Sequence, residues 1–187
     1  MSVHESTRRR LSDRQADTVR RLTDATVTEV RETGYDGLTV RNVARRAGVA
    51  AATAYTYFTS KNHLLTEVFW RRLEALPQTE GDAAQALREI VLLIASEPEL
   101  AAACTTAVLA SDPDVRELRL RIGLDIHQRL VQALGREDKL VLDALEMAYS
   151  GALLQAGMGY MTYAEAADRL AEVARLVSGP PLSPPET

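Results

Sequence analysis

The sequence predicts an all-α fold in which an N-terminal three-helix, helix-turn-helix domain precedes a C-terminal helical domain. Three observations support this prediction. Residues 37–58 have the pattern of two short helices joined by a tight turn, which is the layout of a DNA-binding helix-turn-helix. Apolar residues recur at helical spacing along most of the remaining chain, and no segment alternates convincingly as a strand does.

The first predicted helix begins at Ser12, which forms a capping-box pair with Gln15, and it ends at Gly34. A second helix is capped by Thr39 and precedes a turn at Gly48, where the backbone must be permissive. The other helices are predicted at residues 50–58, 60–76, 83–96, 99–110, 113–134, 138–162 and 164–177.

The chain divides into four predicted segments, which are a flexible basic arm (1–10), the DNA-binding domain with the linking fourth helix (11–76), the ligand-binding and dimerisation domain (77–179) and a disordered Pro-rich tail (180–187). Residues 1–76 contain 13 Lys or Arg against 9 Asp or Glu, whereas residues 77–187 contain 9 against 17. This asymmetry is expected if only the first part meets phosphate. The arm either reaches along a DNA groove or only keeps the chain in solution.

Cysteine usage and hydropathy predict a cytoplasmic protein. The single cysteine, Cys104, has no partner for an internal disulfide, as expected in a reducing compartment. No apolar run approaches the roughly 20 residues of a membrane span. The arginines near the start are not followed by the apolar stretch of a signal peptide, so no membrane partner is predicted.

The spacings around the predicted turn are similar to those of the TetR family of transcriptional repressors. The matching residues are Gly37, Thr39, Ala44, Ala47, Gly48, Val49, Thr53, Tyr55, Tyr57, Phe58, Ser60, Lys61 and Leu64. They cover about the first third of the chain. The run around His63, Leu64 and Leu65 also resembles the branch of the family that governs lipid and steroid catabolism.

The resemblance implies that the helix at residues 50–58 enters the major groove. The candidate DNA contacts are Arg41, Ala51, Ala52, Thr53, Tyr55, Thr56, Tyr57 and Lys61. Arg41 suits guanine or phosphate, and Lys61 suits phosphate unless it is only a solvated surface lysine. Tyr57 is expected to reach the DNA backbone and Phe58 to be core, although either tyrosine of this helix is also compatible with inward packing. Arg45 and Arg46 are expected to face solvent.

A largely apolar effector pocket is expected among the helices that follow residue 76. The candidates, chosen by helical position, are Trp70, Leu73, Ile90, Ile94, Cys104, Leu109, Ile122, Ile126, Tyr149 and Leu153. Plain core is the alternative role for each of them. Because this set contains no charged cluster, the predicted effector is hydrophobic.

The sequence predicts no enzyme, no cofactor and no metal site. It contains no nucleophile, base and orienting group in a recognisable arrangement, and no phosphate-binding glycine loop. Cys104 and His127 are too isolated to form a metal ligand set.

The resemblance implies a homodimer in which the last two helices pair with their copies. The apolar residues that repeat at helical spacing there are Val141, Leu145, Tyr149, Ala152, Leu153, Ala156, Leu170, Val173, Ala174 and Val177. An ordinary core within one chain would show the same pattern.

We therefore predict a ligand-responsive repressor that binds a palindromic DNA operator as a homodimer and is released by a small, hydrophobic effector. Two alternatives remain at this stage. One is a DNA-binding dimer that senses no small molecule. The other is a helical small-molecule carrier, or enzyme, with a degenerate DNA-binding domain.

Overall fold

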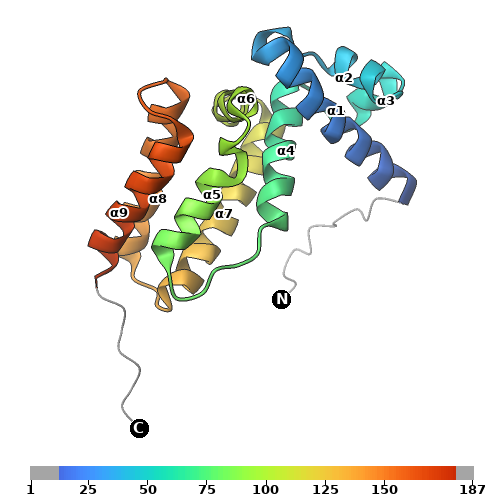
Figure 1. The fold of residues 1–187 in the computed structure, drawn as a ribbon. Coiled ribbons are helices and arrows are strands. Elements are labelled where there is room, and N and C mark those ends of the chain that lie inside the picture. The colour runs from blue at the N-terminus through green and yellow to red at the C-terminus, as the bar shows by residue number, and fades with distance from the viewer. Residues whose placement is uncertain (1–12, 180–187) are drawn as a thin grey trace, which may run out of the picture.

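The computed structural model describes residues 13–179, and within this range the chain forms nine α-helices and no strand (Figure 1). The all-α prediction is confirmed. The helices are α1 (Asp13–Gly37), α2 (Val40–Arg46), α3 (Ala51–Tyr57), α4 (Lys61–Ala75), α5 (Ala83–Ala95), α6 (Pro98–Val108), α7 (Pro113–Leu134), α8 (Lys139–Gly157) and α9 (Tyr163–Ser178). The predicted arm, the predicted tail and the expected cap at Ser12 lie outside the described residues.

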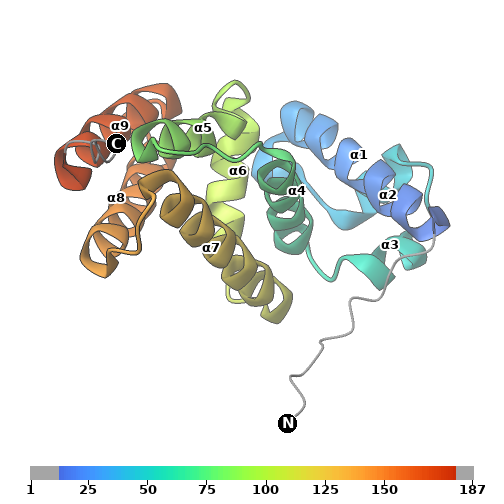
Figure 2. The ribbon, with the colours of Figure 1, turned by 90° about the horizontal axis from the view of Figure 1, so that it is seen from below.

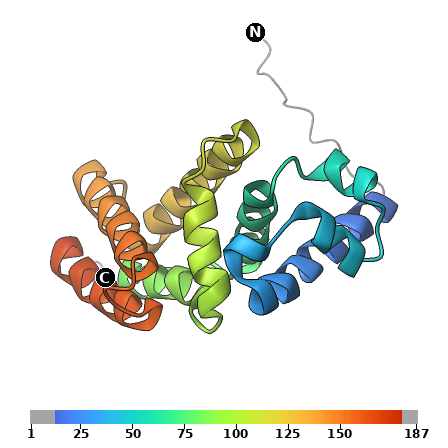
Figure 3. The ribbon, with the colours of Figure 1, turned by 90° about the horizontal axis from the view of Figure 1, so that it is seen from above.

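The helices α1 to α3 lie at one end of the molecule, and α8 and α9 lie at the other (Figures 1 and 2). Helix α4 follows the short helices and packs against α1, α6 and α7, so it joins the two ends. Helix α9 packs against α5 and α8, as the view from above also shows (Figure 3). Within residues 13–179 no single helix has the length and apolar character to cross a membrane, although α5 and α6, bent by 109°, pass as a pair by length and composition.

Most predicted boundaries agree with the structure to within a residue or two, with one larger error at the end of α8. That helix was expected to reach residue 162, but it ends at Gly157 because Gly159 has a φ of 80° and the backbone leaves the helical region there. Thr162 instead begins α9 through a capping box with Glu165. The predicted end of the first helix at Gly34 corresponds to a kink, since Gly34 has a φ of 66° inside α1.

Helices α1 to α4 share one apolar core. Leu22 and Val30 of α1 are fully buried, as are Val43 of α2 and Ala54 of α3. Phe58 is also buried, as predicted, and follows α3 directly. This packing orients α3 by burying Ala54 and Phe58 and thereby turns Ala52, Thr53, Tyr55 and Thr56 outward.

The C-terminal end of α4 is held by a buried arginine from α7. The Arg129 guanidinium donates from Nη2 to the Leu73 carbonyl at 2.8 Å and from Nη1 to the carbonyls of Leu76 and Pro77 at 3.0 and 3.1 Å. Its Nε pairs with Asp125 at 2.5 Å. The last carbonyls of a helix have no partners within the helix, so Arg129 replaces the water that would otherwise bind them.

A polar junction joins the N-terminal helices to the helices that follow. Glu97 directly precedes α6, and its carboxylate pairs with Arg31 of α1 and with Arg72 of α4, both at 2.7 Å. Burial acts to raise the pKa of Glu97, but the hydrogen bonds from the two arginines outweigh it and leave the pKa below its ordinary value. Glu97 therefore stays ionised and links three helices at once.

Candidate functional site

The tight turn between α2 and α3 is built as the sequence predicts. Thr39 caps α2 by accepting a hydrogen bond from the Asn42 amide, and Gly48 has a φ of 63°. Arg21 of α1 donates through Nη2 to the carbonyls of both Ala47 and Gly48. Helix α1 therefore fixes the turn that sets the angle of α3.

The outer face of α3 presents small and hydroxyl-bearing side chains to solvent. Ala52, Thr53, Tyr55 and Thr56 are exposed, and Ala51 is half-buried. The Thr56 hydroxyl donates to the Thr53 carbonyl at 2.6 Å, which occupies its proton within the helix. Thr53 and Tyr55 make no side-chain hydrogen bond within residues 13–179, so both hydroxyls are available to bases or phosphates.

Two other candidate DNA contacts of this region, Tyr57 and Lys61, already make contacts within the chain. Tyr57 is half-buried and packs against the core, so its ring faces inward more than was expected. Lys61 donates from Nζ to the Tyr35 carbonyl at 2.8 Å, and its ammonium lies 4.0 Å from the centre of the Tyr35 ring. An ammonium has three donors, so a phosphate contact by Lys61 stays a prediction.

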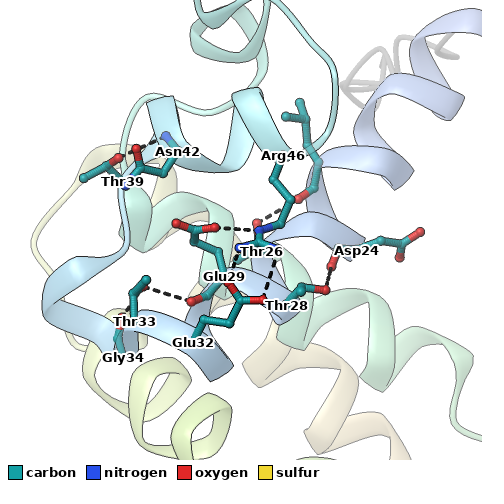
Figure 4. A network of polar contacts seen from close by, with 11 residues as sticks. Asp24, Thr26, Thr28, Glu29, Glu32, Thr33, Gly34, Thr39, Asn42 and Arg46 are labelled. Carbon is teal, nitrogen blue, oxygen red and sulfur yellow. Dashed lines mark hydrogen bonds and ion pairs between the residues drawn. The ribbon is translucent and has the colours of Figure 1, made fainter.

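Arg41, Arg45 and Arg46 of α2 are exposed, as was expected for Arg45 and Arg46, but Arg46 is also held by ion pairs. Its guanidinium turns back onto α1, where it pairs with Glu29 at 2.6 Å and with Glu32 (Figure 4). The Glu29 side chain is 4% exposed, so the ion pair is nearly desolvated on the acid side. Arg46 therefore stabilises the packing of α2 on α1 and adds little positive field toward DNA.

Arg46→Ala is expected to lower the midpoint of thermal unfolding, because it leaves the buried Glu29 carboxylate without its partner. Thermal unfolding of the purified variant measures the loss. Adding Glu29→Gln removes the unpaired charge, so the double variant is expected to recover part of that loss. A double variant no more stable than Arg46→Ala would contradict this account.

A cavity of about 260 Å³ lies in the C-terminal part of the molecule, bounded by α4 to α8. Seven of the predicted effector contacts line it, namely Ile94, Cys104, Leu109, Ile122, Ile126, Tyr149 and Leu153. The volume is slightly below the roughly 300 Å³ at which ligand pockets usually begin, so the cavity suits a compact ligand or part of a longer one. Exposed Leu109 and Leu154 in its wall leave it partly open to solvent.

Three of the predicted pocket residues do not line the cavity. Leu73 and Ile90 are fully buried core residues, and Trp70 packs half-buried against that core. Phe69 is the residue of α4 that faces the cavity. Neighbouring residues of a helix point about 100° apart, so Trp70 faces a different side.

The cavity wall also contains polar groups that the prediction left out. Those groups are Thr105, Arg119, Glu146 and Ser150. The lining is largely apolar, as expected, but the candidate set, which held no charged residue, was incomplete. Helical spacing offered the signal, because Arg119 stands three residues before Ile122, and Glu146 stands three before Tyr149.

The buried thiol and the buried phenol of the cavity wall both keep their protons at neutral pH. Burial raises the pKa of the Cys104 thiol to about 12, and burial also raises the pKa of the Tyr149 hydroxyl. Within residues 13–179 no three His, Cys, Asp or Glu side chains gather as metal ligands. His127 instead pairs through Nδ1 with Glu146 at 2.7 Å, across α7 and α8.

The apolar stripe expected at a dimer interface is largely internal. Leu145, Tyr149, Ala156, Leu170 and Ala174 are all buried within the chain. A second apolar row on α8 faces outward instead. It consists of Leu140, Ala144, Met147, Gly151, Leu154 and Met158, and its largest members are exposed. Helix α8 is therefore apolar on two sides, and one of them has no partner within residues 13–179.

These features define a class of protein: an exposed helix-turn-helix on a helical domain that encloses a small apolar cavity is a DNA-binding regulator. The model for bacterial regulatory proteins of the tetR family matches residues 22–68. An uncharacterized HTH-type transcriptional regulator of Mycobacterium bovis is 47% identical over 174 residues, which cover 88% of this chain and 82% of that protein. The chain belongs to the TetR family of transcriptional regulators.

One further similarity in sequence agrees with this assignment, and a solved structure shares the fold. The HTH-type transcriptional repressor KstR of Mycolicibacterium smegmatis is 39% identical over 75 residues, which cover 40% of this chain and 37% of KstR. The crystal structure of a TetR transcriptional regulator from Rhodococcus sp. RHA1 superposes with a TM-score of 0.70 at 20% identity, covering 89% of this chain and 97% of that chain.

Proposed function

We propose that this regulator is a repressor that binds a palindromic operator in the cytoplasm as a homodimer and is released by a small, largely apolar effector. The observation that carries the proposal is the position of α4. Only three residues separate the end of α3 from the start of this helix, and through Phe69 the helix forms part of the cavity wall. A ligand that changes the position of α4 therefore changes the position of α3.

A second contact between cavity and DNA-binding helices supports the same proposal. At the start of α7, Asp114 accepts a hydrogen bond from the Thr59 hydroxyl at 2.6 Å, and Asp112 accepts one from the Asn62 amide at 3.2 Å. Thr59 lies just after α3 and Asn62 lies in α4. A ligand shifts the equilibrium between two such arrangements only by its difference in affinity for them.

The proposed DNA contacts are the exposed residues of α3 together with Arg41. Ala52 and Thr53 lie where base edges would be met, with Tyr55 and Thr56 beside them on the exposed surface. Arg41 supplies a guanidinium able to bind guanine or phosphate. Lys61 adds a phosphate contact through the ammonium hydrogens that do not bond to the Tyr35 carbonyl.

The proposed dimer forms through the last two helices, with the outward row on α8 as its apolar centre. Two half-sites of a palindrome lie about 34–36 Å apart, so two DNA-binding domains must be held at a distance. Helices α8 and α9 lie at the end of the molecule away from α3, which suits that requirement (Figure 1).

Met147→Glu is expected to convert the dimer to a monomer, because it places a charge at the centre of the outward row, where Met147 is 71% exposed. Sedimentation velocity measures the mass of the particle. Gln128→Glu, an exposed change on α7, is the control and is expected to leave the dimer intact. A dimer that survives Met147→Glu would place the interface elsewhere.

The experiment that tests the proposed function is retention of the DNA upstream of this protein's own gene, titrated across salt concentrations with competitor DNA present. Tight, salt-dependent retention that a small apolar compound reverses is the expected result. Retention that no compound in a broad apolar panel reverses would favour a DNA-binding dimer without an effector. Binding no tighter than to random DNA would contradict the proposal at this site.

A further inference from the structure

We propose that the cavity binds an apolar molecule that carries a terminal anionic group, with the anion held by Arg119. The proposal rests on the proposed function, because it assigns the chemical class of the effector for the same cavity. Three observations support the proposal. Arg119 is the arginine of the cavity wall, two of its guanidinium nitrogens have no hydrogen-bond partner within residues 13–179, and the acidic residue of the wall, Glu146, lies away from it.

The part of the cavity wall that surrounds Arg119 is almost entirely apolar. Its neighbours in the wall are Val108 and Leu109 at the end of α6 and Ile122 one turn along α7. Within residues 13–179 no carboxylate lies within ion-pair distance of Arg119, whereas most other arginines of α7 are paired with an acid. The cation therefore has no neutralising partner from the described chain.

The orientation of Arg119 is fixed by one of its two terminal nitrogens. Nη1 donates to the Val108 carbonyl at 2.7 Å and to the Ala110 carbonyl at 3.3 Å, at the C-terminal end of α6. Nε and Nη2 have no hydrogen-bond partner within residues 13–179. These two nitrogens form one edge of the guanidinium, and two parallel N–H donors on one edge match the two oxygens of a carboxylate.

The negative charge of the cavity lies at the other end and orients the ligand. Glu146 is paired with His127 of α7, and Arg119 and His127 are eight residues apart on that helix, which spans about 12 Å at the α-helical rise. An anion is attracted to the Arg119 end and repelled from the Glu146 end. The apolar part of the ligand then lies along Ile122, Ile126 and Leu153 between them.

The test compares three probes that share a ten-carbon chain and differ only in the terminal group: decanoate, 1-decanol and decylammonium. Isothermal titration of the full chain at neutral pH is expected to show decanoate binding about tenfold or more tightly than 1-decanol, with decylammonium the weakest. In Arg119→Gln decanoate and 1-decanol are expected to bind alike. Arg119→Lys, which keeps the charge, is expected to retain a preference for decanoate.

Two further variants complete the design. Arg116→Gln removes an exposed cation of α7 that is not in the cavity wall and is expected to leave the preference unchanged. Gly123→Phe adds a ring at a residue of the cavity wall, where a Cβ would meet no atom within 4 Å, and it is expected to weaken all three probes. Thermal unfolding of each variant checks that it is folded.

The outcomes separate this proposal from the one on which it rests. Equal binding of decanoate and 1-decanol by the unaltered chain would overturn the anion site and leave an apolar effector in place. Binding of none of the three probes would overturn both the anion site and the use of this cavity as the effector site. If Arg119→Gln fails to fold, the three probes on the unaltered chain and on Arg119→Lys still decide the matter.

Discussion

Thr53→Glu is expected to weaken operator binding at least about 100-fold, since a new negative charge on the exposed face of α3 would meet the phosphates or base acceptors of the major groove. Juxtaposed like charges cost several kcal/mol at an interface, and about 1.4 kcal/mol corresponds to a factor of ten. Thr53 is exposed and is the third residue of α3, where an acidic side chain is compatible with the helix dipole. Electrophoretic mobility shift with the operator DNA measures the loss.

Thr53→Gln is the matched control, because it has nearly the same size as Glu and no charge. It is expected to lose much less affinity than Thr53→Glu. Both variants are expected to unfold at the temperature of the unaltered chain. If Thr53→Glu bound the operator as tightly as Thr53→Gln does, α3 would not lie in the groove through this face.

Arg129→Ala is expected to lower the free energy of unfolding by about 2–4 kcal/mol, because one buried guanidinium donates to three carbonyls and pairs with a carboxylate. The change removes the donor to the carbonyls of Leu76 and Pro77, leaves the Leu73 carbonyl with only the Leu76 amide, and removes the partner of Asp125. In a chain of this size the midpoint of thermal unfolding is expected to fall by about 5–15 °C.

Circular dichroism at 222 nm during heating measures this loss. Arg121→Ala is the control, since Arg121 lies on the same helix but pairs with Glu117 at the surface. Surface ion pairs contribute little, so this control is expected to melt close to the unaltered chain. A similar melting temperature for Arg129→Ala and Arg121→Ala would show that water replaces the buried guanidinium without penalty.

Local signals in the sequence predicted the DNA-binding part well. The cap at Thr39, the left-handed turn at Gly48 and the buried Phe58 each depend on a few neighbouring residues, so spacing alone was enough. The ion pair of Arg46 with Glu29 joins residues that are distant in the sequence. No local pattern in the sequence distinguishes an arginine that pairs with a distant acid from an exposed arginine without a partner.

In the C-terminal part, the periodicity of apolar residues was not sufficient to predict which side of a helix is buried. Helix α8 is apolar both on its buried side, at Leu142 and Leu145, and on its outward side, at Leu140 and Met147. A repeat of three and four residues fits either side, so the choice between chain core and dimer surface needed the packing of α9 and α6 against α8. The charged cavity residue Arg119 was missed for a different reason, because only apolar side chains were considered for the wall.

The buried thiol in the cavity wall has a practical consequence for following α3 in solution. Thiol reagents react with the thiolate, and a thiol with a pKa of about 12 is almost wholly protonated at neutral pH. Cys104 is also the one cysteine of the sequence and is 3% exposed. A cysteine introduced on the exposed face of α3 can therefore be labelled selectively with a fluorophore or spin label while Cys104 stays in place. Movement of α3 then becomes measurable in a chain whose cavity is chemically unaltered.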